Sequence, residues 1–61
     1  MPNISSKELT ALEDQLGFEQ VLVKKYRTIA NTSNDQVIKS KCEEIANKHQ
    51  EHYNKLLTFL G

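Results

Sequence analysis

Cysteine, proline and glycine are all scarce in this sequence. One cysteine (Cys42), one proline and two glycines occur among its 61 residues. A lone cysteine excludes an internal disulfide, and the absence of paired cysteines excludes the usual structural zinc pattern, which points to a reducing compartment. Because a hydrophobic core of this size is marginal by itself, we expect the chain to be stabilised by association with a partner.

Long apolar runs and an excess of either charge are also missing. The first residues, MPNISSKELT, lack the pattern of a secretion signal, and no run is long enough to cross a membrane, so we expect a cytoplasmic protein. Eight basic residues balance eight acidic ones, and the two signs are interspersed. Such a chain has no basic surface typical of nucleic-acid or bilayer binding, which disfavours both partners.

The first half of the chain carries the pattern of one long amphipathic helix. Ser5 and Glu8 have the spacing of a capping box, in which each side chain bonds to the other residue's backbone N–H. Residues of the inner stripe then recur at steps of three and four: Leu9, Leu12, Leu16, Glu19, Val23, Tyr26 and Ala30. This spacing predicts a helix over about residues 6–30.

A polar turn and a second helix follow. The segment NTSND, residues 31–35, is rich in side chains that favour turns and helix caps, and we expect Ser33 or Asn34 to cap the next helix, with Asp35 in its first turn. The stripe returns over residues 36–60 as Ile38, Cys42, Ile45, His49, His52, Leu56 and Phe59.

The predicted fold is therefore all-α, a single antiparallel helical hairpin over residues 1–61. Two helices cannot enclose a core, so we expect two hairpins to pair as a homodimeric four-helix bundle. Gly17, in the middle of the first helix, should cost about 1 kcal/mol relative to alanine; either close helix approach or tolerated weakness would account for it. Phe18 lies off the main stripe and suggests a further surface contact.

Three stripe positions are polar: Glu19, His49 and His52. Antiparallel helices joined near Ser33 would bring these side chains to one level, and burying a carboxylate beside imidazoles is costly without partners. A divalent metal ion bound by all three would remove that cost, because carboxylate and neutral imidazole are both good ligands. The three ligands are compatible with zinc, iron and manganese.

A glutamate on one helix and a histidine-terminated pair on the next resemble half of a ferritin-like metal bundle. The stretch FEQVLVKKYRTIANTSNDQVIKSKCEEIANKHQEHYNKL is similar to the Coat F family of spore coat proteins. The resemblance implies a metal site in the dimer core, with Glu19 as the first-helix carboxylate and His52 as the motif histidine. His49 replaces the second glutamate of oxidase-type ferritins, which argues against oxidase activity and favours zinc or another late divalent metal. Other spore coat proteins are then possible partners, and the spore coat a possible location.

Other interpretations remain open. The three polar residues could form a hydrogen-bonded layer that fixes helix register without a metal. Short basic runs on both helices would suit a small dimeric RNA-binding bundle, and the apolar face would suit a structural assembly module. No nucleophile with its base and no phosphate-binding loop is present, so we do not expect an enzyme.

Overall fold

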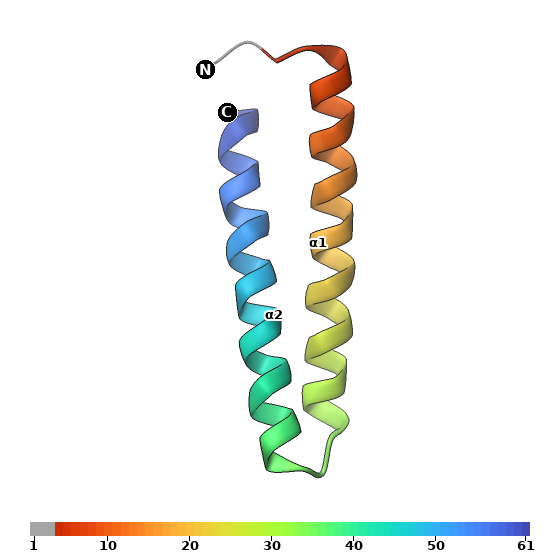
Figure 1. Cartoon of the computed structure of the whole chain (residues 1–61), viewed down its shortest axis with the longest axis vertical. Coiled ribbons are helices and arrows are strands. Elements are labelled where there is room, and N and C mark those ends of the chain that lie inside the picture. Colours follow the sequence, from red (N-terminus) through yellow and green to blue (C-terminus); the bar gives the residue numbers. More distant parts are fainter. Residues whose placement is uncertain (1–3) are drawn as a thin grey trace.

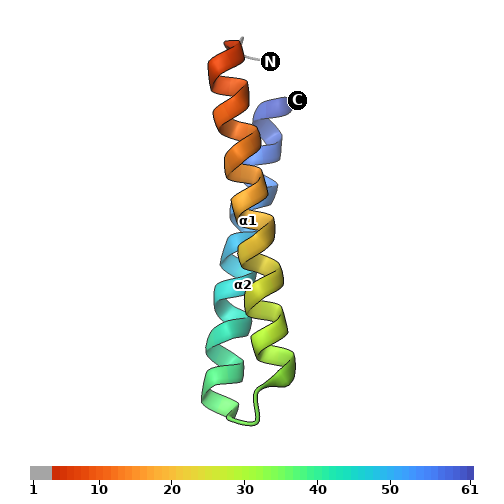
Figure 2. The same cartoon turned by 90° about the vertical axis from the view of Figure 1, so that its right-hand side faces the viewer.

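The protein folds as an antiparallel hairpin of two long helices (Figure 1). A computed structural model describes residues 4–61, in which α1 spans Ser6–Thr32 and α2 spans Gln36–Leu57, followed by the short 3-10 helix η1, Thr58–Leu60. Seen from the side, one helix lies behind the other at a shallow angle, so the chain forms a single layer 46 Å long and 11 Å across its thinnest dimension (Figure 2). The prediction of an all-α helical hairpin is confirmed.

The start of α1 is fixed by the predicted capping box. The Glu8 N–H donates to Ser5 Oγ over 3.1 Å, and the Ser5 N–H donates to Glu8 Oε1 over 2.9 Å. The helix ends two residues later than predicted, at Thr32 rather than Ala30. The Thr32 hydroxyl donates to the Thr28 carbonyl, so a side chain expected to favour the turn is accommodated inside the last helical turn.

The cap of α2 differs from the prediction. Asp35, not Ser33 or Asn34, is the N-cap: its Oδ1 accepts from the N–H groups of Val37 at 2.8 Å and Ile38 at 3.1 Å. A carboxylate is well suited to this role because it accepts two orphan backbone donors and carries charge of the favourable sign for the helix dipole. Ser33 instead tightens the turn, accepting from the Asp35 N–H at 3.1 Å.

The core between the helices is small. Four apolar residues are buried among those described, and they are Leu16, Ala30, Cys42 and Ala46. Larger side chains remain exposed in the single chain, including Phe18, Ile38 and Phe59. Among the described residues, a single helical layer thus leaves eight large apolar side chains exposed. Within residues 4–61, neither helix contains a stretch long and apolar enough to cross a bilayer.

The two sides of the helix–helix seam differ in character. On one side the seam is bridged by polar pairs: Gln20 Nε2 donates to the Tyr53 hydroxyl at 3.1 Å, and an Arg27 amino group donates to Asn47 Oδ1 at 3.4 Å. Another part of the seam opens into a groove of about 230 Å³. The groove is lined by Gln15, Glu19, His52, Lys55, Leu56 and Phe59.

Gly17 does not serve close packing of the two helices. A Cβ atom built on this residue would meet nothing within 4 Å. Of the two explanations open from the sequence, close approach of α2 is therefore wrong, and within the single chain Gly17 is simply a weak position in α1.

Candidate metal centre

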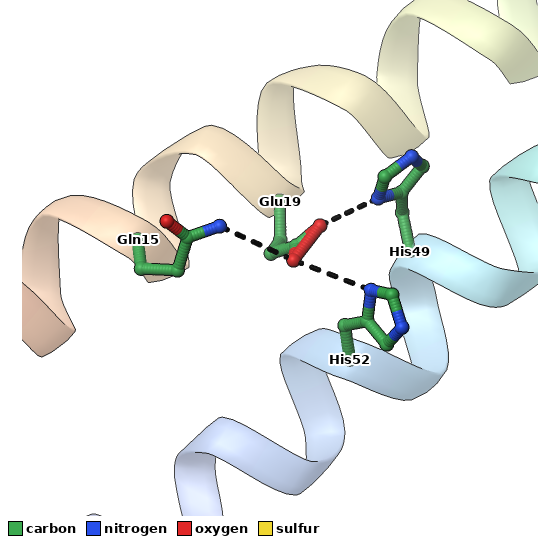
Figure 3. Close-up of polar contacts among 4 residues, drawn as sticks. All are labelled: Gln15, Glu19, His49 and His52. Carbon is green, nitrogen blue, oxygen red and sulfur yellow. Dashed lines mark hydrogen bonds and ion pairs between the residues drawn. The ribbon is translucent and has the colours of Figure 1, made fainter.

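The structure brings Glu19, His49 and His52 together midway along the hairpin (Figure 3). Glu19 Oε1 lies 2.6 Å from His49 Nδ1, and Glu19 Oε2 lies 3.5 Å from His52 Nδ1. The carboxylate projects from α1, while both imidazoles project from successive turns of α2, where residues three apart share a face. Each of the two carboxylate oxygens thus faces one imidazole.

The three side chains differ in burial. The Glu19 side chain is only 6% exposed, the His49 side chain is 24% exposed and the His52 side chain is 59% exposed. The three residues occupy stripe positions that the sequence predicts to be buried. In the single chain Glu19 is buried, His49 is partly buried and His52 is exposed. This gradient follows from position, because Glu19 lies in the seam and His52 lies at the edge of the groove.

Two neighbours that the sequence did not identify hold the centre in place. Gln15 Nε2 donates to Glu19 Oε2 at 3.4 Å, and the ring of Tyr26 stacks on His49 with centroids 6.4 Å apart. Gln15 precedes Glu19 by four residues, a helical spacing that could have indicated the contact. Tyr53, which follows His52 in the sequence, takes no part in the group, because its hydroxyl accepts from Gln20.

Comparison with known proteins gives a relative but no described activity. No protein-family model matches the chain, and no solved structure gives a significant match. The uncharacterized protein YuzM of Bacillus subtilis is 30% identical over 57 residues, covering 93% of this chain and 70% of YuzM. The chain belongs to the YuzM family. The YuzM match covers both helices, and the name of this relative gives no activity for the site.

The Glu19 carboxyl of this YuzM-family chain is held in its ionised form. Burial alone would raise its pKa, but hydrogen bonds from His49 and Gln15, together with the charges of the two histidines, outweigh burial and leave the pKa below the usual glutamate value. An ionised carboxylate is the form that binds a metal ion, so the surroundings favour the ligand-competent state.

The donor set of this site fits a divalent ion. Glu19, His49 and His52 each offer one ligand atom, and these atoms lie within 4.8 Å of one another. Ligands at the 2.0–2.2 Å bond lengths of tetrahedral zinc are roughly 3.4 Å apart, so small side-chain adjustments would suffice. The free Cys42 thiol is buried seven residues before His49, about two helical turns away, and is not part of this group.

Proposed function

We propose that this protein binds a divalent metal ion through Glu19, His49 and His52. The observation that carries the proposal is the convergence of one ionised carboxylate and two imidazoles, the only histidines of the chain, from opposite arms of the hairpin. One negative carboxylate and two neutral imidazoles leave a bound divalent ion with a net charge of about +1 and an incomplete coordination sphere. A water molecule or another ligand would complete it.

Zinc is the preferred ion for this donor set. Two imidazoles and one carboxylate form a zinc site in several proteins, and the same combination binds non-haem iron(II). Manganese prefers oxygen-rich sites, and here nitrogen donors outnumber the single carboxylate. The protein's role would then be to bind the ion, without an assigned reaction.

We further propose that two hairpins pair as a ferritin-like four-helix bundle with this site in its interior. The exposed apolar side chains and the small core of the single chain support the pairing, because such surfaces are normally covered. The Glu19 and His52 positions match the Coat F resemblance, which suggests a spore-coat or spore-associated role with other coat proteins as possible partners. Self-pairing is the simplest form of this assembly.

Titration of tag-free protein with Zn²⁺ or Co²⁺ tests the metal site. We expect one ion per protomer, with tetrahedral or five-coordinate absorption bands for Co²⁺, and at least a tenfold loss of affinity in Glu19→Gln and in His52→Ala. Glu13→Gln, which changes an exposed glutamate of the same helix, is the matched control and should bind like wild type. Equal metal affinity in all four proteins would exclude the site.

The metal-free polar layer is the second candidate because two observations favour it. Glu19 Oε1 lies within hydrogen-bond distance of His49 Nδ1, at 2.6 Å. Within residues 4–61, no buried side-chain polar atom lacks a partner. The same titration distinguishes the two functions. If the layer only fixes helix register, Glu19→Gln would lower stability while neither it nor wild type binds metal.

A further inference from the structure

Two rows of exposed residues with identical spacing run along the hairpin. The row on α1 is Asp14, Phe18, Val21 and Lys25, and the row on α2 is Glu44, Lys48, Glu51 and Lys55. Steps of four, three and four keep each row on one strip of its helix surface. Phe18 and Val21 are 63% and 64% exposed, which is unusual for apolar residues at the centre of a charged strip.

Both rows flank the side of the hairpin that carries the groove. Lys55 itself lines the groove, and Phe18 lies three residues after Gln15, another lining residue, hence on the neighbouring part of the same face. Gln20 follows Gln15 by five residues, about 140° around the helix, so the polar pairs Gln20–Tyr53 and Arg27–Asn47 bridge the other side of the seam. The groove side is therefore the one left open for a partner.

Each row is complementary to a second copy of itself that runs in the opposite direction. Reversing the α1 row about the midpoint between Glu19 and Gln20 sets Asp14 opposite Lys25, and Phe18 opposite Val21. An antiparallel copy of α1 would thus make apolar contacts at its centre and an acid–base pair at each end.

The α2 row behaves in the same way. Reversal about the midpoint between His49 and Gln50 sets Glu44 opposite Lys55, and Lys48 opposite Glu51. Every charge then faces a charge of the opposite sign. A parallel arrangement in the same register would instead place like charges opposite each other, which is unfavourable.

The two midpoints lie at one level of the hairpin. Glu19 and His49, which flank them, are joined by the 2.6 Å contact. Glu19 is also the central residue of α1, thirteen residues from Ser6 and thirteen from Thr32. A single two-fold axis perpendicular to the helices can therefore pass both midpoints and still align two hairpins along nearly their whole length.

We infer that a second copy of this chain docks antiparallel on the groove side, α1 against α1 and α2 against α2, with the two-fold axis at the level of Glu19 and His49. This inference rests on the pairing proposed above and adds its face, direction and register. Such an interface is isologous, so every contact occurs twice. It covers Phe18 and the exposed part of His52, and it brings the two Glu19–His49–His52 groups to the same cross-section of the bundle.

Charge exchange within the α2 row tests the register. Glu51→Lys would place a positive charge opposite Lys48 of the second copy at two symmetric positions. Sedimentation at about 50 mM salt should then show dimerisation weakened about tenfold. Lys48→Glu combined with Glu51→Lys re-creates opposite charges and should restore the dimer to within about threefold. Glu43→Lys makes the same charge change on another strip of α2 and should leave the dimer unchanged.

Different outcomes test the register, the pairing and the metal site separately. A wild-type dimer in which the double exchange fails to rescue Glu51→Lys, or in which Glu43→Lys is equally harmful, would overturn the register while leaving the pairing and the metal site standing. A wild-type chain that stays monomeric at millimolar concentration would overturn the pairing itself. The metal titration tests the metal site independently of the register and of the pairing.

Discussion

At the scale of single residues, Glu19 is the centre of the candidate site, because each of its carboxylate oxygens faces one imidazole. Glu19, His49 and His52 interrupt an apolar stripe, and antiparallel geometry was enough to bring them to one level, as the structure shows. Their supports were harder to foresee. The Tyr26–His49 stacking depends on how the two helices rotate about their axes, which a pattern of apolar residues specifies only to within a fraction of a turn.

The lowered pKa of Glu19 predicts a pH-dependent stability in metal-free protein. Because the folded pKa lies below the unfolded value of about 4.3, the ionised carboxylate stabilises the fold above that pH, and this stabilisation is lost as the pH falls through the lower folded pKa. Urea unfolding in chelator between pH 5 and pH 3 should show wild type losing stability relative to Glu19→Gln. Glu13→Gln should remain parallel to wild type. A constant difference between wild type and Glu19→Gln would contradict the assignment.

At the scale of elements, helix positions were predictable because their signals are local. The capping box at Ser5 and the apolar spacing act within a few residues, and both survive in the structure. The turn was less predictable, since Ser33, Asn34 and Asp35 are all good caps and only the geometry of chain reversal selects Asp35. The end of α1 at Thr32 was missed because turn-forming residues also tolerate a last helical turn.

Gly17 offers a test of how α1 is stabilised. With open space around its Cβ position, Gly17→Ala should raise the free energy of unfolding by about 0.5–1 kcal/mol through reduced backbone entropy in the unfolded chain. Ala11→Gly, an exposed position on the same helix, is the opposite change and should cost a similar amount. Thermal unfolding measured by circular dichroism checks both. A destabilising Gly17→Ala would contradict the open space found around this residue.

At the scale of the whole molecule, the main feature is how little apolar surface the hairpin buries compared with what it exposes. A layer of two helices buries few large side chains, whereas the rows on α1 and α2 repeat one spacing at one level of the hairpin. The sequence suggested that a partner is needed, and the direction that we infer for the pairing depends on the Glu19–His49 contact, which sets how the two rows align. The alignment of the two rows depends on the loop and on how each helix is rotated about its axis. Local residue spacing specifies neither.

If a second copy completes the fold, the stability of the chain must depend on its concentration. Unfolding of a dimer releases two chains, so mass action raises Tm as protein concentration increases, whereas a stable monomer shows no such change. We expect Tm measured in chelator to rise steadily between about 5 and 500 µM protein, because the apolar groove side is covered only in the dimer. Val21→Asp places charge opposite Phe18 of the second copy and should flatten this dependence. Leu57→Asp introduces the same charge at an exposed apolar residue four positions after Tyr53, on the bridged side of the seam, and should leave the dependence steep. A wild-type Tm that is constant over this range would show that the single hairpin is sufficient, and the exposed apolar face would then need another occupant.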